Sequence, residues 1–314
     1  MIKKFLDLGM QPLANKYLTK KDIIKKNKEQ FYHLEVGFNS KTKLVSIINT
    51  VSSKKMFDDK YPYKSSMSQT MISSFKKLAK NLIKTYNPNS ILEIGSNDGP
   101  LIKNFSKKKV VCVEPCKNLA KITKRMGYKT YSNFWDMQLA KKIKSKTKNI
   151  DLIYSSNTLS HINDLNSVFR SITYILSDDG ILIIEEPSLL ECLQKISYDQ
   201  FYNEHIHVFS LLSINNLIRK YRLEIFNIEK LNTHGGSLRY YIKKVSNNKF
   251  EIHKKVKKQL NQELKYGINK YSTYIEFKNR VESSKKKLKQ IFLKLKKKIK
   301  KLSVMEQQLS QAQF

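Results

Sequence analysis

Residues 90–99 read Ser-Ile-Leu-Glu-Ile-Gly-Ser-Asn-Asp-Gly, a short apolar run with one embedded acid followed by a turn between Gly95 and Gly99. A run of this length bounded by glycines is typical of a buried strand that feeds a tight loop. Glycine lets the backbone of such a loop approach a ligand closely. The stretch therefore predicts an α/β fold with a ligand at the end of this strand.

A second buried strand with a terminal acid follows about twenty residues later. It reads Val110-Val-Cys-Val-Glu114. In an open α/β sheet, an acid at the end of the second strand accepts hydrogen bonds from the ribose of a nucleoside ligand. The Glu-x-Gly-x-x-x-Gly loop differs from the loop that binds a pyrophosphate, and its embedded Glu93 favours a cationic ligand without phosphate. We therefore expect S-adenosylmethionine; an ordinary strand-turn-helix of an unrelated α/β protein is the alternative.

Composition narrows the class of protein. The 314 residues suffice for one main domain with smaller additions, and three cysteines (Cys112, Cys116 and Cys192) are too few for a disulfide framework. We interpret them as free thiols in a cytoplasmic protein. No apolar run reaches transmembrane length and the start lacks a secretory signal, so we expect no membrane insertion.

The formal charge of +34 raises the question of nucleic acid binding. The lysines are spread along the whole chain together with many Ile and Asn residues, as biased codon use in a genome of low G+C content would produce. They form no face interleaved with aromatics. We therefore expect no nucleic acid partner, and a positive field that attracts an anionic substrate such as a nucleotide-sugar.

Strand and helix signals alternate through the middle of the chain. This rhythm predicts a doubly wound, Rossmann-like and largely parallel sheet. Before it, residues 1–60 suggest a small mixed lobe with a turn at Gln11-Pro12-Leu13, and apolar spacing predicts a helix over 63–86. Helix 168–176 is expected to stop at Ser177-Asp-Asp-Gly180, and the strand with Arg239 is expected at the end of the sheet. The predicted strands are 31–38 and 44–50 in the lobe, then 90–94, 110–114, 151–155, 181–186, 223–229 and 237–243.

Residues 250–302 are predicted to be helical. Their apolar stripe lies among lysines, which is typical of a helix that packs against its own protein, and a basic amphipathic helix can also bind an acidic membrane or a partner groove. We expect packing against the rest of the chain. The stripe consists of Leu288, Ile291, Phe292, Leu295, Ile299 and Leu302.

Groups suited to acid–base chemistry gather in residues 197–207. Tyr202, Glu204 and His205 lie together after the strand ending at 187, with His207 beside them, at the edge where open α/β sheets bind ligands. A histidine beside a carboxylate and a phenol can accept a proton near neutral pH. Taken one at a time, such residues are more often surface or capping groups.

Two further histidines, His161 and His234, are candidates for the ligand site. His161 follows the third strand of the sheet and should share its ligand-binding edge. His234 precedes two glycines, where a simple tight turn and a role in lining the substrate site are equally compatible with the sequence. Because the histidines lack metal-ligand spacing and no cysteine is near them, we assign no metal.

Several motifs together resemble the nucleotide-sugar C-methyltransferases of deoxysugar biosynthesis, a family of class I S-adenosylmethionine-dependent methyltransferases. The resemblance covers roughly residues 5–285. It rests on Leu8-Gly-Met-Gln-Pro-Leu-Ala-Asn15, Tyr61-Pro-Tyr-Lys-Ser-Ser66, Glu93-Ile-Gly-Ser-Asn-Asp-Gly99, Asn157-Thr-Leu-Ser-His161, Tyr198-Asp-Gln-Phe-Tyr-Asn-Glu-His205 and His234-Gly-Gly-Ser-Leu-Arg239.

The resemblance implies a mechanism in which a base removes the proton on the carbon next to a sugar ketone, and the resulting enolate attacks the sulfonium methyl group. His205 would be the base, and Glu204 and Tyr202 would orient it or stabilise the enolate. Tyr63 and His161 would line the sugar site. The remaining implied roles are cofactor binding by Glu93, Gly95, Ser96, Asn97, Gly99, Glu114 and Asn157, and substrate binding by His207, His234 and Arg239.

Two departures from the family pattern affect the ends of the chain. The family's N-terminal lobe binds zinc through two Cys-x-x-Cys pairs; here the first pair is missing and Asn39 and Thr42 stand in place of the second, so zinc is not expected. Family members continue into a second nucleotide-fold domain, whereas this chain reaches Phe314. A frameshift in or after the lysine-rich run is one hypothesis, and a shifted frame of the tail permits a Gly-Tyr-Gly-Ala loop.

We therefore predict three parts. Residues 1–75 form the N-terminal lobe, 76–247 the Rossmann-like cofactor domain, and 248–314 a helical segment that begins a truncated second domain. The predicted function is C-methylation of a nucleotide-linked keto-deoxysugar for polysaccharide or glycoside synthesis. The alternatives are O- or N-methylation of another small molecule, and an inactive or nucleic-acid-binding remnant.

Overall fold

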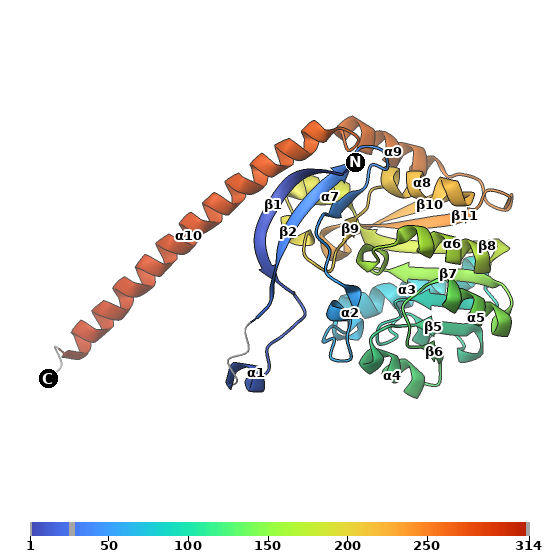
Figure 1. Cartoon of the computed structure of the whole chain (residues 1–314), viewed down its shortest axis with the longest axis horizontal. Coiled ribbons are helices and arrows are strands. Elements are labelled where there is room, and N and C mark those ends of the chain that lie inside the picture. The colour runs from blue at the N-terminus through green and yellow to red at the C-terminus, as the bar shows by residue number, and fades with distance from the viewer. Residues whose placement is uncertain (1, 25–28, 312–314) are drawn as a thin grey trace.

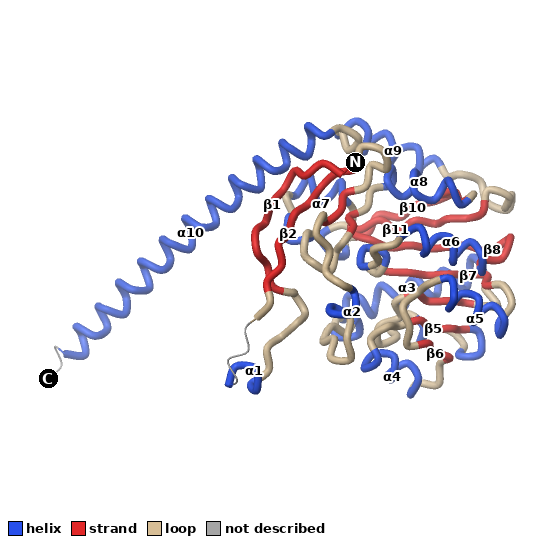
Figure 2. The backbone as a smooth tube through the Cα atoms, in the orientation of Figure 1, coloured by secondary structure: helices blue, strands red, loops and turns tan. Residues whose placement is uncertain are grey.

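A computed structural model describes residues 2–24 and 29–311, and side chains as far as Ile299. A seven-stranded sheet forms the centre of the molecule, and a smaller four-stranded sheet lies beside it (Figures 1 and 2). The order of the large sheet is β10 (Leu223–Leu231), β11 (Ser237–Lys244), β8 (Leu176–Pro187), β7 (Ile150–Ser156), β4 (Ile91–Ile94), β5 (Val110–Val113) and β6 (Lys129–Tyr131).

The large sheet is mostly parallel, as predicted. β8, β7, β4, β5 and β6 pair in parallel, and β11 runs antiparallel to both β8 and β10. The prediction that the strand containing Arg239 lies at the end of the sheet is wrong, because β11 is inserted between β8 and β10 and β10 forms the edge. The short β6 was not predicted, since its three residues carry little hydrophobic pattern.

Both faces of the large sheet are apolar, which explains the continuous hydrophobic runs of its strands. Along β7, Ile153 joins the core on one face while Leu152 and Tyr154 join the core on the other. Helices α5, α6 and α8 contribute to the first core, and α3 contributes to the second. The helices are α1 (Lys20–Ile24), α2 (Ser53–Met56), α3 (Gln69–Tyr86), α4 (Lys117–Arg125), α5 (Met137–Thr147), α6 (Leu165–Ile175), α7 (Leu189–Lys195), α8 (Leu211–Ile218), α9 (Lys254–Tyr266) and α10 (Tyr271–Gln311).

Two predicted boundaries differ from the structure. α3 begins at Gln69 rather than at residue 63, because the Ser68 side chain caps it by accepting a hydrogen bond from the Met71 amide. α6 ends at Ile175, and β8 begins at once with Leu176, so residues 177–180 belong to the strand and Gly180 is no helix stop. In both cases local polar contacts or strand pairing override the periodic pattern.

The N-terminal lobe is completed by the cofactor domain. Its sheet has the order β1 (Ile2–Pro12), β2 (Phe31–Asn39), β3 (Val45–Ile47) and β9 (His207–Val208), so its fourth strand comes from a distant part of the chain. The predicted turn at residues 11–13 is displaced, because β1 extends to Pro12 at an edge position. The division at residues 75 and 247 stays a prediction.

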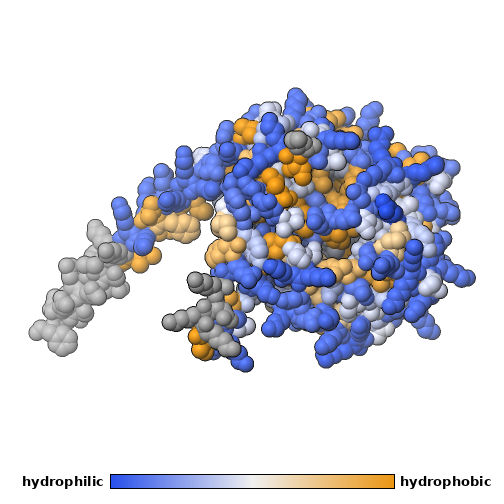
Figure 3. All heavy atoms as spheres, viewed as in Figure 1, coloured by the Kyte–Doolittle hydropathy of each residue, from blue (hydrophilic) through white to orange (hydrophobic). Residues whose placement is uncertain are grey.

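The C-terminal region is helical, as predicted, but it breaks at Gly267 into α9 and α10. Tyr274, Phe277 and Val281 near the start of α10 are buried against the N-terminal lobe. Beyond them α10 projects away from the body (Figure 1), and an apolar patch is visible on the coloured part of this helix (Figure 3). The expected packing of this stripe against the chain is wrong from Leu288 to Ile299, which are exposed, and the Leu302 side chain lies outside the described residues.

None of the helices in the described parts of the chain has the length and apolar character needed to cross a bilayer.

Candidate active site

A cavity of about 320 Å³ lies where the carboxyl ends of β4, β5, β7 and β8 meet. This is the edge at which open α/β sheets bind ligands. Most of the site residues predicted from sequence line it, although they come from separate segments of the chain. They are Tyr63, Glu93, Gly95, Ser96, Asn97, Glu114, Asn157, His161, Tyr202, His205 and His234.

The glycine-bounded loop after β4 needs its glycine for steric reasons. Gly95 has φ +79°, and a Cβ atom there would lie 2.1 Å from the Thr158 Oγ1 atom. The loop is also fixed to the end of β5, because the Asn97 amide donates to Glu114 Oε2 at 2.8 Å. The Cys116 amide donates to Glu114 Oε1 at 2.9 Å. The two chain segments that the sequence singled out are thus joined through one carboxylate.

The cavity combines buried carboxylates with an absence of cationic side chains. Glu93 and Glu114 are each 4% exposed, and burial raises the pKa of both. Among the described residues that line the cavity, none is Lys or Arg. Glu93 Oε2 and Ser96 Oγ have no hydrogen-bond partner within the described chain. Since buried polar groups are normally paired, this lining fits a cationic ligand with hydrogen-bond donors.

Tyr202 and His205 form a hydrogen-bonded pair in the wall of the cavity. Tyr202 Oη lies 3.0 Å from His205 Nε2, and His205 Nδ1 lies 3.0 Å from the carbonyl oxygen of Gln200. Because a carbonyl can only accept, Nδ1 carries the proton and Nε2 accepts from the phenol. Burial lowers the pKa of His205 to about 3, with a smaller contribution from nearby His161. The imidazole is therefore neutral at pH 7, and its Nε2 lone pair is directed at the Tyr202 phenol.

His161 stands beside this pair. Its Nδ1 donates to the Glu204 carbonyl oxygen at 2.7 Å, and its ring centroid lies 5.1 Å from that of His205. Burial lowers the pKa of His161 to about 4. Two neutral imidazoles therefore face one cavity, and the pKa of His205 lies far below the near-neutral value that its neighbours in the sequence led us to expect.

Four predicted site residues do not line the cavity: Glu204, Gly99, His207 and Arg239. The Glu204 carboxylate is fully buried, where it accepts hydrogen bonds from Asn15 and Tyr61. Gly99 has φ +87° and supports the loop from behind. Their predicted roles, orienting the base or stabilising the enolate for Glu204 and cofactor binding for Gly99, stay predictions.

His207 and Arg239 are held by the fold instead. His207 lies in β9, and its Nδ1 is 2.8 Å from the Ser46 hydroxyl of β3. Arg239 donates from Nη2 and Nε to Glu185 Oε2 at 2.8 and 3.0 Å and forms a second ion pair with Glu229. Because β11 is an internal strand, this guanidinium is 4% exposed and pairs across the sheet. The predicted role of both residues in substrate binding is not supported by their positions.

Other lining residues were not predicted as site residues. Asn15, Tyr61 and Gln200 lie within motifs quoted for the family resemblance, so a signal for them existed. The aromatic residues Phe134 and Trp135, which follow β6, had none. The main unpredicted lining residues are Asn15, Phe57, Tyr61, Phe134, Trp135 and Gln200.

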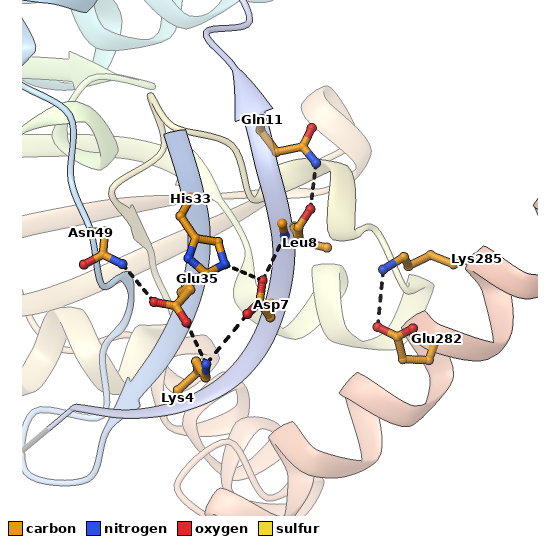
Figure 4. Close-up of polar contacts among 10 residues, drawn as sticks. Lys4, Asp7, Leu8, Gln11, His33, Glu35, Asn49, Glu282 and Lys285 are labelled. Carbon is orange, nitrogen blue, oxygen red and sulfur yellow. Dashed lines mark hydrogen bonds and ion pairs between the residues drawn. The ribbon is translucent and has the colours of Figure 1, made fainter. Parts of the chain in front are cut away.

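A candidate metal cluster lies away from the cavity, in the N-terminal sheet. Asp7, His33 and Glu35 bring one potential ligand atom each to within 4.8 Å of one another (Figure 4). Lys4 Nζ already supplies a cation there, at 2.6 Å from Glu35 Oε1 and 3.7 Å from Asp7 Oδ2. The group is therefore satisfied by an internal ion pair and does not fit a metal.

A family model described as "Methyltransferase domain" matches residues 63–227, which include the cavity loops and the Tyr202–His205 pair. The chain belongs to the methyltransferase domain family. Its cofactor is S-adenosylmethionine, a sulfonium cation that suits the acidic cavity. When bound, this cofactor supplies an electrophilic methyl group.

Two shorter matches flank this methyltransferase domain. A model described as "C-methyltransferase C-terminal domain" matches residues 232–305, and one described as "Putative zinc binding domain" matches residues 1–57. Residues 1–57 do not fit zinc, because they contain no cysteine. Asn39, at the place of the second cysteine pair, holds the turn itself: its Oδ1 accepts from the amides of Lys41 and Thr42 at 2.9 and 3.1 Å.

Relatives of the methyltransferase were found among curated proteins and solved structures. It is 25% identical over 277 residues to the C-methyltransferase NovU of Streptomyces niveus, which covers 87% of this chain and 65% of NovU. A methyltransferase from Clostridium acetobutylicum aligns over 55% of this chain and 92% of its own, at 12% identity and TM-score 0.41. The magnesium protoporphyrin IX methyltransferase of Synechocystis aligns over 55% and 79%, at 10% identity and TM-score 0.42.

Proposed function

We propose that this methyltransferase transfers a methyl group to a carbon next to a ketone, on a nucleotide-linked deoxysugar. The observation that carries the proposal is the Tyr202–His205 pair, whose atoms lie 3.0 Å apart in the wall of the cofactor cavity. Methylation of an oxygen or nitrogen can proceed from a lone pair, whereas methylation of carbon requires a base. The similarity to NovU, itself a C-methyltransferase, supports the same reaction type.

The cofactor side of the cavity is proposed to use the two buried carboxylates. Glu114 would accept hydrogen bonds from the ribose hydroxyls at the end of β5. Glu93 would face the positive charge of the amino acid part, since its Oε2 atom is buried and unpartnered within the described chain. Asn97 and Asn157 adopt left-handed backbone conformations, with φ of 49° and 48°, and shape the loops on either side.

The base is proposed to be His205, acting through Tyr202. Its Nδ1 proton is held by Gln200, so Nε2 is aimed at the phenol. The substrate carbon would give its proton to the Tyr202 oxygen while the phenol proton moves to His205 Nε2. The electron pair left on carbon forms an enolate, and the carbon then attacks the methyl group. Burial raises the pKa of Tyr202, so the phenol stays protonated between turnovers.

The sugar would occupy the part of the cavity lined by Tyr63, His161 and His234. Hydrogen-bond donors among these side chains would stabilise the enolate oxygen. Because the described lining contains no Lys or Arg, the anionic nucleotide would lie outside the cavity, on the basic surface of the chain. This arrangement places the neutral sugar inside and the charged group outside.

Deuterium exchange tests the reaction type. The chain is incubated in D₂O with S-adenosylhomocysteine and each member of a panel of keto-deoxysugar nucleotides, and the sugar is analysed by mass spectrometry. The proposal expects deuterium at the carbon next to the ketone, and loss of that exchange in His205→Ala. Methyl transfer to any substrate without such exchange would favour O- or N-methylation instead.

A further inference from the structure

We infer that Asn15 and Tyr61, from the N-terminal part of the chain, are positioning residues for the loop at 201–206. This loop, called the catalytic loop below, carries Tyr202 and His205. Asn15 and Tyr61 act through Glu204, the residue immediately before the proposed base His205. The inference depends on the proposed function only for the role of His205. The geometry that carries it consists of hydrogen bonds, burial and strand pairing.

Within the described chain, the side chains that donate hydrogen bonds to the Glu204 carboxylate are Asn15 and Tyr61. Asn15 Nδ2 donates to Glu204 Oε1 at 3.0 Å and to Oε2 at 2.9 Å. The Tyr61 hydroxyl donates to Glu204 Oε2 at 2.9 Å. Glu204 has no exposed surface, so these donors replace the water that a carboxylate would otherwise bind.

The Glu204 backbone transmits this contact to both active-site histidines. Its carbonyl oxygen accepts the His161 Nδ1 proton at 2.7 Å, and His205 is the next residue in the chain. A shift of Glu204 would therefore move the His205 backbone and release the His161 ring. Since Glu204 lies outside the cavity lining, we assign it a positioning role rather than a part in proton transfer.

A second anchor lies just beyond His205. The Ile47 amide donates to the Ile206 carbonyl at 2.8 Å, and Ser46 pairs with His207 where β9 joins the N-terminal sheet. The catalytic loop is thus fixed by the lobe through a side chain on one side of His205 and through a strand on the other. The N-terminal lobe therefore supports the catalytic loop on both sides of His205, and its sheet has a positioning role.

Because the Glu204 carboxylate is buried, its position depends on the donors Asn15 and Tyr61. Burial raises the pKa of Glu204, while the hydrogen bonds from Asn15 and Tyr61 lower it. Removing a donor would leave a buried acceptor without a partner, and such a group relaxes by moving toward water. Movement of Glu204 is expected to weaken the hydrogen bonds that hold the Nδ1 protons of His161 and His205.

Proton NMR of the full chain with ¹⁵N-labelled histidine tests this without any sugar substrate. The buried Nδ1 protons of His161 and His205 should give downfield signals at pH 7 in the presence of S-adenosylhomocysteine. We expect Asn15→Ala to lose both signals, and Tyr61→Phe, which removes one oxygen atom, to weaken both. The reciprocal swap of Asn15→Asp with Glu204→Gln should restore them, because the new amide donates to the new carboxylate.

Asn49→Ala is the matched control. Asn49 Nδ2 also donates to a carboxylate of the same lobe, Glu35 Oε2, at 2.8 Å, but on the exposed side of β2 (Figure 4). This variant should keep both imidazole signals. The inference is overturned if Asn15→Ala and Tyr61→Phe keep both signals unchanged, if Asn49→Ala loses them equally, or if the swap fails to restore them.

The same samples separate this inference from the proposed function. Calorimetric titration with S-adenosylhomocysteine measures cofactor binding in each variant, and Asn49→Ala, which lies outside the cavity lining, should give the wild-type affinity. Absence of carbon-bound deuterium in the wild type would remove the proposed reaction, yet the imidazole signals would still decide whether Asn15 and Tyr61 hold the loop.

Discussion

Tyr202 Oη and His205 Nε2 face each other at 3.0 Å in the wall of the cavity, and the other ring nitrogen of His205 is fixed by the Gln200 carbonyl. The imidazole can therefore accept a proton only by way of the phenol. This relationship refines the sequence-based prediction of a single histidine base into a two-residue relay.

His205→Ala and Tyr202→Phe should both lower the rate of methyl transfer, by about 10²–10⁴-fold, because general base catalysis contributes about that much. Both variants should bind S-adenosylhomocysteine as tightly as the wild type. Transfer of a labelled methyl group and calorimetric titration measure the two quantities. A Tyr202→Phe variant with full activity would show that His205 acts without the phenol.

The active-site histidines should leave the rate insensitive to mild acid. Burial lowers the pKa of His205 to about 3 and that of His161 to about 4, so both remain neutral until the pH falls below about 5. These two histidines should therefore contribute no acid limb to kcat/KM for methyl transfer between pH 7 and pH 5. A proton NMR titration of either ring centred near pH 6.5 would contradict this burial.

The same histidines should make the free energy of unfolding decrease as the pH falls below about 6.5. Their pKa values are lower in the folded chain than in the unfolded chain, where histidine titrates near 6.5. Their contribution is complete above about pH 6.5 and is lost as the pH falls toward the folded values, by about 1.4 kcal/mol per pH unit for each group. Circular dichroism at each pH defines the range in which the kinetic test is valid.

Glu114→Ala should weaken binding of S-adenosylhomocysteine by about 10–100-fold, because hydrogen bonds to a charged group contribute about 1.5–3 kcal/mol. The variant also frees the Asn97 and Cys116 amides that Glu114 holds. Calorimetric titration measures the change. Asp178→Ala, which removes a carboxylate with 89% of its side chain exposed, is the control and should bind normally. Equal affinities in the two variants would remove Glu114 from the cofactor site.

Two glycines with similar backbone angles provide a matched steric test. Gly9 has φ +73° with nothing within 4 Å of an added Cβ atom, whereas Gly95 has φ +79° and an added Cβ would meet Thr158 Oγ1 at 2.1 Å. Gly9→Ala should cost only the left-handed strain of about 1–2 kcal/mol. Gly95→Ala should cost more and abolish cofactor binding. Urea unfolding and calorimetry compare them, and equal costs would mean that Thr158 does not confine the loop.

The N-terminal lobe is predicted to be stable without zinc. EDTA should leave the Tm of the chain unchanged, because residues 1–57 lack cysteine and Asn39 holds the turn through two amides. Asn39→Ala should instead lower the free energy of unfolding by about 1 kcal/mol, the usual net value of such hydrogen bonds. A fall in Tm on chelation would show that the lobe binds a metal.

Local sequence pattern was sufficient to predict the strand and loop arrangement at the ligand-binding edge of the sheet. The run at 91–94, its glycine-bounded turn and Glu114 lie within 24 consecutive residues, and parallel strands bring their carboxyl ends to one edge whatever follows. The order of strands and helices could likewise be predicted from the spacing of apolar residues along the chain. These are local properties, and local pattern is what a sequence displays directly.

Tertiary structure alone decided the roles of the polar residues outside that stretch. Arg239 and Glu204 are both candidate site residues in the sequence. In the structure, Arg239 of the internal strand β11 pairs with Glu185 of β8, whereas Glu204 is held by Asn15, 189 positions away in the chain. The insertion of β11 and the recruitment of β9 into the N-terminal sheet follow from which strands pair, and the alternation of side chains does not specify a strand's partner. Burial, and with it the charge of each imidazole, depends on those pairings.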